Sequence, residues 1–125
     1  MENAAGKRSF AALSLSPATL GSLEAKGYES PTPVQEESIP KALAGKDLVV
    51  QSRTGTGKTA AFGIPIVEKV DPAREAVQAV VLAPTRELAV QVAQEIAELG
   101  RGRGVKVQSV YGGDARRELE GVKKS

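Results

Sequence analysis

Residues 52–59 (SRTGTGKT) place glycine, lysine and threonine at spacings that suit a phosphate-binding loop. Gly55 and Gly57 permit positive φ angles and let the backbone approach a ligand closely. Successive N–H groups can then form an anion nest at the positive end of a following helix. From that position, Lys58 can reach the β- and γ-phosphates of a nucleotide, and the Thr59 hydroxyl can hold Mg²⁺.

The other members of this stretch allow two interpretations. Ser52, Thr54 and Thr56 carry hydroxyls that can donate further hydrogen bonds, and Arg53 lies between them. Ser52 stands where the usual P-loop pattern has its first glycine, a place that needs only a small residue. The alternative is a turn between a strand and a helix that happens to contain Gly-Lys-Thr.

Two further stretches, residues 84–89 (PTRELA) and 111–113 (YGG), combine turn residues with possible anion contacts. Thr85 is a candidate N-cap, which puts Arg86 in the first helical turn. The helix dipole disfavours a cation there, so this arginine is better explained if its side chain faces an anion. The alternative is an ordinary N-cap followed by a solvated arginine. The paired glycines can offer backbone amides to a ligand, or they can simply form a turn.

Residues 27–35 (GYESPTPVQ) read as a helix stop followed by a helix start, with Thr32 as N-cap and Gln35 at the capping-box position. Phe10 and Tyr28, two of the four aromatic residues, flank this region. An aromatic ring can stack on a base and a Gln amide can pair with an adenine edge. The alternative is that both rings belong to the core.

The elements around these stretches alternate between helices and strands. Residues 85–100 show the clearest helical period, with an apolar stripe of Leu88, Val92, Ile96 and Leu99. Such alternation is typical of an α/β fold with a parallel sheet and crossover helices, whose ligands bind beyond the carboxyl ends of the strands. The pattern predicts helices at 16–27, 32–45 (kinked by Pro40), 57–69 (disturbed by Pro65), 85–100 and 115–125, and strands at 47–51, 79–83 and 105–111.

Composition limits the chemistry available to these 125 residues, which contain no cysteine and no histidine. Disulfides, thiol catalysis, Cys/His zinc sites and histidine acid–base chemistry are therefore excluded. No apolar run reaches the length of a membrane span, and the polar start is unlike a signal peptide, so we expect a soluble, cytoplasmic protein without membrane contacts. The net charge is +2, with a basic excess after residue 100 that suits either an anionic partner or a solvated face.

Taken together, these stretches resemble the N-terminal part of the first RecA-like domain of DEAD-box ATP-dependent RNA helicases. GYESPTPVQ is similar to the family's Q motif, with Phe10 as the upstream aromatic, and SRTGTGKT to its motif I. PTRELA is similar to motif Ia, and YGG to the GG motif. The resemblance divides the chain into a Q-motif region (1–36) and part of the ATP-binding domain (37–125).

The resemblance implies ATP and Mg²⁺ as ligands and RNA as a partner bound through its backbone, independently of sequence. It implies that Lys58 and Thr59 act on the triphosphate and that Thr59 meets the metal. For ATP it implies Phe10, Tyr28, Ser30, Gln35, Ser52, Arg53, Thr54, Gly55, Thr56, Gly57, Lys58 and Thr59; for RNA it implies Pro84, Thr85, Arg86, Gly112 and Gly113.

The chain departs from the family in what it lacks. No apolar strand ends in an acid, as the Asp-Glu-Ala-Asp motif would require, and the Ser-Ala-Thr motif and the second RecA-like domain are missing. We therefore expect a piece of a longer helicase with an incomplete sheet and negligible ATPase activity alone. A stand-alone, non-catalytic RNA-binding module and another P-loop enzyme, such as a small kinase, are the alternatives.

Overall fold

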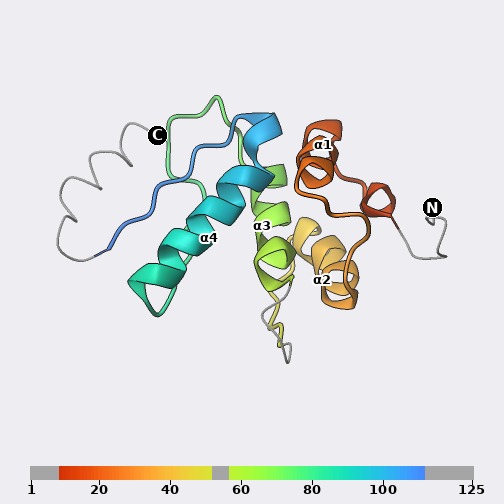
Figure 1. The fold of residues 1–125 in the computed structure, drawn as a ribbon, viewed down its shortest axis with the longest axis horizontal. Coiled ribbons are helices and arrows are strands. Elements are labelled where there is room, and N and C mark those ends of the chain that lie inside the picture. The colour runs from red at the N-terminus through yellow and green to blue at the C-terminus, as the bar shows by residue number, and fades with distance from the viewer. Residues whose placement is uncertain (1–8, 52–56, 112–125) are drawn as a thin grey trace.

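The structure is a computed structural model that describes residues 9–51 and 57–111. Within these residues the chain forms four α-helices and two short 3₁₀ helices, arranged as Figure 1 shows. In chain order they are η1 (Phe10–Leu13), α1 (Pro17–Ala25), α2 (Pro33–Leu43), α3 (Lys58–Lys69), α4 (Arg86–Leu99) and η2 (Arg101–Arg103). The helix predicted at 115–125 lies outside the described residues.

The predicted helix starts are confirmed by their caps. The Ser16 hydroxyl accepts a hydrogen bond from the Thr19 amide at 3.3 Å, and a proline follows each of the first two caps. Thr32 and Gln35 form the reciprocal capping box that their spacing predicts. Thr85 caps α4 by accepting from the amide three residues on, at 3.1 Å.

Prolines inside helices do not end them here. Pro40 lies inside α2 and Pro65 inside α3, and both helices continue beyond these positions. Tertiary packing of the apolar faces offsets the loss of one hydrogen bond at each proline. Gly27 and Gly45, at φ +80° and +85°, lie just beyond α1 and α2 and confirm the predicted stops.

The core forms where α3 packs between α2 and α4 (Figure 1). Ile39 of α2, Ile64 and Val67 of α3 and Leu99 of α4 are all 0% exposed. The helices approach closely at Gly63, where an added Cβ would lie 3.0 Å from Leu99 Cδ1. Burying apolar surface stabilises a folded chain by about 25 cal/mol per Å², so the packing of these three helices makes a large contribution to stability.

Three of the four residues in the predicted apolar stripe of α4 are buried. They are Val92, Ile96 and Leu99, whereas Leu88 is 38% exposed. Figure 1 shows the reason: the start of α4 projects away from α3, and the helix meets the core only further along.

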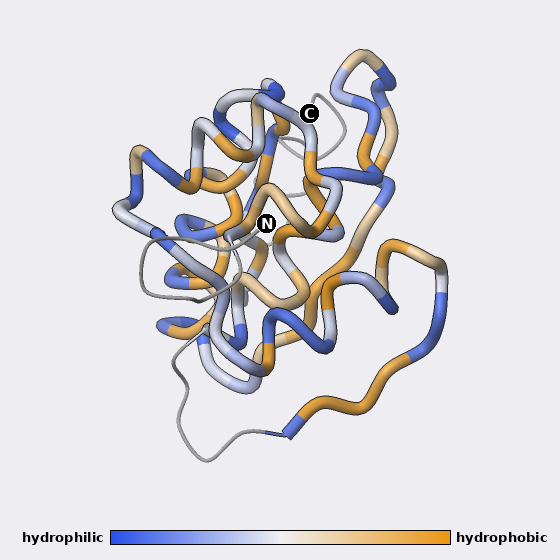
Figure 2. The backbone as a smooth tube through the Cα atoms, turned by 90° about the vertical axis from the view of Figure 1, so that its right-hand side faces the viewer, coloured by the Kyte–Doolittle hydropathy of each residue, from blue (hydrophilic) through white to orange (hydrophobic). Residues whose placement is uncertain are grey.

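No paired strand occurs among the described residues, so the predicted parallel sheet is not confirmed. The segments at 47–51 and 79–83 run outside the helices as largely apolar stretches, which Figure 2 colours orange, whereas residues 105–111 alternate between apolar and polar side chains. In the first two segments Val49 is 94% exposed, Leu82 92% and Val80 75%, whereas Val105 and Val107 of the third are partly buried against the core. A strand needs a neighbour to pair its N–H and C=O groups, and these segments have none within 9–51 and 57–111.

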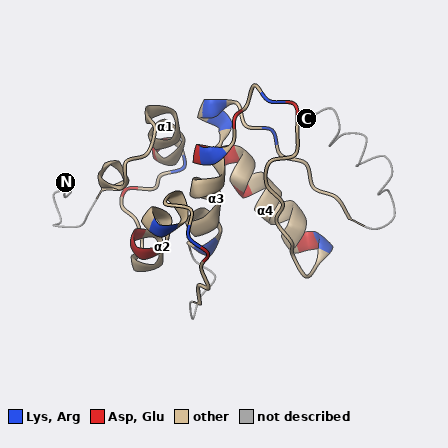
Figure 3. Cartoon of the chain, turned by 180° about the vertical axis from the view of Figure 1, so that it is seen from behind, with Lys and Arg blue, Asp and Glu red and all other residues tan. Residues whose placement is uncertain are grey.

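Charged residues of both signs are interspersed rather than separated. Acidic and basic residues occur together on α2 and at the start of α4 (Figure 3). Of the helices that the structure describes, none has the length and apolar character needed to cross a membrane. Over the same residues, no group of three acidic side chains converges as a metal site would require.

Candidate functional site

The start of α2 and the start of α3 are joined by the side chain of Gln35. This residue is 3% exposed, and its Nε2 donates to the Gly57 carbonyl at 3.2 Å. Its Oε1 accepts from the Thr32 amide at 2.9 Å, which completes the capping box. The structure thus brings residues 27–35 against the end of residues 52–59, a contact that local sequence patterns do not reveal.

The junction leaves no room for a side chain at Gly57. Its φ of +83° lies in the left-handed region, and an added Cβ would meet Gln35 Nε2 at 2.9 Å and Thr32 Oγ1 at 3.1 Å. Gly57 is the N-cap of α3, so Lys58 and Thr59 occupy its first turn, both half-buried. The predicted phosphate-site residues Ser52, Arg53, Thr54, Gly55 and Thr56 lie outside the described residues.

The two aromatic residues of the predicted adenine site lie together. The rings of Phe10 and Tyr28 stack with centroids 6.3 Å apart and planes at 23°. Phe10 is 4% exposed and belongs to the core cluster, whereas Tyr28 is only partly buried at its edge. Phe10 is therefore a core residue, as one of the two interpretations of the sequence has it. Ser30, further along the same loop, is half-buried.

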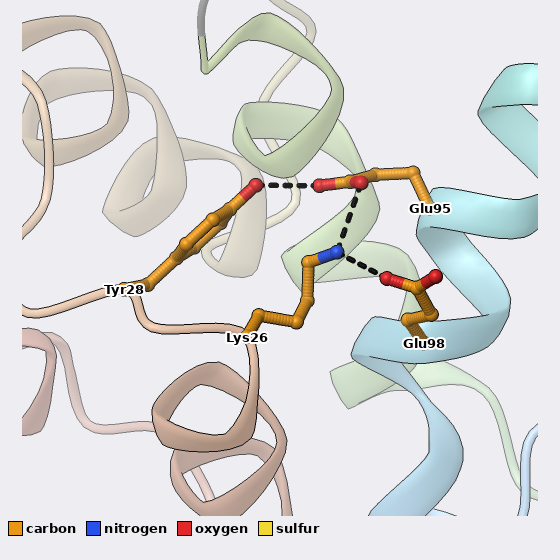
Figure 4. A network of polar contacts seen from close by, with 4 residues as sticks. All are labelled: Lys26, Tyr28, Glu95 and Glu98. Atoms are coloured by element: carbon orange, nitrogen blue, oxygen red, sulfur yellow. Dashed lines mark hydrogen bonds and ion pairs between the residues drawn. The ribbon is translucent and has the colours of Figure 1, made fainter.

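The Tyr28 hydroxyl is held by α4. It donates to Glu95 Oε1 at 2.6 Å, while Lys26 pairs with Glu95 Oε2 at 3.0 Å and with Glu98 (Figure 4). Burial, followed by the bond to Glu95, raises the pKa of Tyr28. Burial of Lys26 lowers its pKa, but the hydrogen bonds and charges of Glu98 and Glu95 have the larger, opposite effect. The pKa of Lys26 is therefore raised, and the ammonium stays charged.

Sequence reasoning missed this network. Glu95 follows Val92 by three residues and precedes Leu99 by four, so it lies beside the buried stripe of α4, whereas the sequence pattern assigns both Glu95 and Glu98 to the solvent side. Their partners Lys26 and Tyr28 are more than sixty residues away in the chain. The only local signal is the i, i+3 spacing of the two acids, which by itself indicates a charged surface.

Of the residues predicted to contact RNA, those at 84–86 lie at the other end of α4, beside Tyr111. The Arg86 guanidinium lies over the Tyr111 ring, 5.1 Å from its centroid, which places residues 84–86 beside the end of the 105–111 segment. Thr85 serves as the N-cap, as its position predicts. Pro84 directly precedes it and is exposed. Gly112 and Gly113 lie outside the described residues.

Part of the basic excess after residue 100 has a structural role. Arg103 Nη1 donates to the Val70 carbonyl at 3.0 Å and also to the Val67 carbonyl, which caps the last turn of α3. This arginine therefore stabilises a helix C-terminus. Lys106 is exposed, and Arg116, Arg117, Lys123 and Lys124 lie outside the described residues.

A groove of about 510 Å³ runs between α4 and the apolar segments on either side of it. Its walls include Val92 and Ile96 of α4 together with residues 76–83 and 105–110. Gln35, Gly57 and Tyr28 do not line it. The groove follows two of the segments predicted as strands, 79–83 and 105–111.

Known proteins identify the family. The family model for DEAD/DEAH box helicases matches residues 32–124. The DEAD-box ATP-dependent RNA helicase CshA of Bacillus cereus is 50% identical over 116 residues, which cover 92% of this chain and 22% of that protein. This chain thus spans about a fifth of the length of that relative.

Solved structures of RecA-like helicase domains agree. A DEAD box protein from Methanococcus jannaschii superposes with a TM-score of 0.81 at 40% identity, covering 94% of this chain and 32% of that one. Dbp5 of S. cerevisiae, bound to RNA and ADP BeF3, superposes with a TM-score of 0.75 at 36% identity, covering 78% and 25%. The chain belongs to the DEAD/DEAH box helicase family.

Proposed function

We propose that this chain supplies the ATP-binding part, and some of the RNA-backbone contacts, of an ATP-dependent RNA helicase. The observation that carries the proposal is the hydrogen bond from Gln35 to the Gly57 carbonyl. It ties the Q-motif region to the end of the P-loop stretch at the N-terminus of a twelve-residue helix. That helix end is positive and suits a phosphate.

The residues present fit a magnesium–triphosphate group. Gly57 lacks room for a Cβ, and Lys58 and Thr59 follow in the first turn of α3. Lys58 would bind the β- and γ-phosphates and the Thr59 hydroxyl would hold Mg²⁺, which supplies charge neutralisation at the phosphates. Tyr28, supported by Phe10, would stack on adenine, and Gln35 with the backbone near Ser30 would select it.

Residues 52–56 complete this proposed site. Their amides and the hydroxyls of Ser52, Thr54 and Thr56 would surround the phosphates, with Arg53 among them and Gly55 permitting the tight turn.

For RNA we propose contacts to phosphate and sugar from Pro84, Thr85 and Arg86, together with Gly112 and Gly113. The Arg86 guanidinium already stands against an aromatic ring at 5.1 Å, which restricts its orientation. Backbone contacts of this kind are independent of base sequence and weaken as salt rises. ATP and RNA as ligands suit a protein that acts in the cytoplasm.

We further propose that the segments 47–51, 79–83 and 105–111 pair as parallel strands in a longer chain. The apolar composition and exposure of 47–51 and 79–83 support this, because a parallel sheet is buried on both faces. Hydrolysis and duplex separation would then need an acidic strand end and a second RecA-like domain, so we expect negligible turnover from these 125 residues alone.

Nucleotide affinity tests the proposal directly. In calorimetric titrations we expect the 125-residue chain to bind ATP more tightly than GTP. Lys58→Ala should weaken ATP binding about tenfold or more, since a charge-assisted bond contributes about 1.5–3 kcal/mol. Gln35→Ala should reduce the preference for adenine.

Lys41→Ala is the matched control, because Lys41 is half-exposed on α2 and pairs only weakly, at 3.5 Å, with Glu37. It should leave ATP affinity unchanged. Equal affinity for GTP and ATP would overturn the adenine assignment. RNA binding without nucleotide binding would favour a stand-alone RNA-binding module instead.

A further inference from the structure

The loop between α1 and α2 carries the aromatic residue of the proposed adenine site, and α4 anchors that residue. The backbone of Tyr28, in this loop, is fixed by its amide, which donates to the Leu23 carbonyl of α1 at 3.0 Å, but this bond does not hold the ring. Its hydroxyl instead donates to Glu95 Oε1 at 2.6 Å, across a sequence separation of 67 residues. The ring is thus restrained at its hydroxyl end by a helix that belongs to the RNA side of the proposed site (Figure 4).

Glu95 is itself held in place. Its second oxygen, Oε2, accepts from Lys26 Nζ at 3.0 Å, and Lys26 also pairs with Glu98. The side chains of Lys26 and Glu95 are only 14% and 25% exposed, so this pair is shielded from water more than a surface ion pair is. Lys26 also lies 5.5 Å from the centre of the Tyr28 ring. Both oxygens of Glu95 therefore have a fixed partner.

Phe10 restrains the same ring by stacking, at 6.3 Å between centroids. With Phe10, Glu95 and Lys26 together, the ring is held by its plane and by its hydroxyl. A phenylalanine at this position would keep the stacking and lose the hydroxyl contact. The chain thus offers a substitution that separates the two restraints.

We propose that Glu95 is a positioning residue that holds the Tyr28 ring ready for the base of the nucleotide. The inference rests on the proposed function, because it assumes that Tyr28 stacks on adenine. A ring ordered before binding loses less conformational freedom when the ligand arrives, so the gain appears in affinity for the base. Lys26 acts through Glu95 by fixing its carboxylate.

The test measures two ligands on the 125-residue chain: ATP, and inorganic tripolyphosphate, which probes the phosphate site alone. We expect Tyr28→Phe and Glu95→Ala each to weaken ATP binding about threefold to tenfold, with tripolyphosphate affinity unchanged. The double variant should bind ATP no more weakly than the weaker-binding single variant, because both substitutions remove the same hydrogen bond. Glu95→Gln keeps an acceptor oxygen and should recover part of the affinity.

Glu37→Ala is the control, since that side chain is 77% exposed on α2. The inference is overturned if Tyr28→Phe and Glu95→Ala bind ATP like the wild type while Tyr28→Ala binds it weakly. It is also overturned if Glu95→Ala weakens the binding of ATP and of tripolyphosphate equally, since that indicates a general effect on folding. Tyr28→Phe removes only the hydroxyl, so it tests the same contact with less risk to folding. Failure of the proposed function looks different: the wild type would not bind ATP, or Lys58→Ala would bind it normally.

Discussion

Gly57 combines two constraints in one residue, a left-handed backbone and a side-chain position already filled by Gln35 and Thr32. Gln35 contributes through both ends of its amide, one to the cap of α2 and one to the Gly57 carbonyl. A change at either residue therefore disturbs the start of two helices.

At this scale we predict the effect of Gly57→Ala in urea unfolding. Positive φ costs an alanine about 1–2 kcal/mol, and the contact with Gln35 Nε2 at 2.9 Å adds to it. Gly27→Ala isolates the backbone part, since Gly27 has φ +80° and nothing within 4 Å of an added Cβ. We expect Gly57→Ala to lower the free energy of unfolding further than Gly27→Ala; equal losses would show that the contact with Gln35 costs nothing.

Single residues also show what sequence can reveal. The spacing of Thr32 and Gln35 predicts the capping box, because that motif is local. The bond from Gln35 to Gly57 spans 22 residues and that from Tyr28 to Glu95 spans 67, so no local pattern contains them. The family resemblance implies that Gln35 and Gly57 belong to one ATP site, but only the coordinates supply the hydrogen bond between them and that between Tyr28 and Glu95.

Between elements, a single carboxylate fastens α1 to α3. Glu68 accepts from the Ser16 amide at 3.1 Å, from the Ser16 hydroxyl at 2.8 Å and from the Thr19 hydroxyl. Burial opposes ionisation of Glu68, but these hydrogen bonds outweigh it and hold its pKa below the usual 4.5. The carboxylate thus joins the start of one helix to the end of another.

The lowered pKa of Glu68 gives a prediction with a definite sign. A group whose folded pKa is depressed contributes stability above its unfolded pKa and loses it as the pH falls through the folded pKa. The wild type should therefore lose more unfolding free energy below about pH 5 than Glu68→Gln does. Urea titrations from neutral to acid pH measure this, with Glu37→Gln as the exposed control. Parallel curves for wild type and Glu68→Gln would contradict it.

The same contact can be weakened from α1. Thr19 is 0% exposed, so Thr19→Val keeps the packing and removes one donor to Glu68. We expect the free energy of unfolding to fall by about 1–2 kcal/mol, the usual cost of losing a buried hydrogen bond. Thr85→Val makes a useful comparison, because Thr85 caps an exposed helix start.

Elements differ in how well sequence predicts them. The four described α-helices were predicted because caps, stop glycines and the apolar period are properties of neighbouring residues. The segments at 47–51, 79–83 and 105–111 have strand-like composition, yet a strand exists only when another backbone pairs with it. Leu88 shows the same limit inside a helix, since it shares the periodicity of the buried residues and is nevertheless 38% exposed.

At the scale of the molecule, the segments outside the helices carry most of the large apolar side chains that are exposed among the described residues. Val49, Val80 and Leu82 are between 75% and 94% exposed, and unpaired apolar segments of this kind tend to associate. We predict that the 125-residue chain self-associates as its concentration rises, measurable by sedimentation velocity. Leu82→Lys should reduce this association.

Gln91→Lys is the matched control, because it adds the same charge at an exposed position on α4. It should leave the sedimentation behaviour near that of the wild type. A monomer at every concentration for the unaltered chain would show that these segments are covered in solution in some other way.

Helix α4 touches an aromatic residue near each of its ends, Tyr28 through Glu95 and Tyr111 through Arg86. At 1.5 Å per residue, the two attachment points lie about 13 Å apart along one rigid rod. Thermodynamic linkage then imposes a symmetry on the longer protein. If nucleic acid strengthens nucleotide binding by some factor through this rod, nucleotide must strengthen nucleic-acid binding by the same factor.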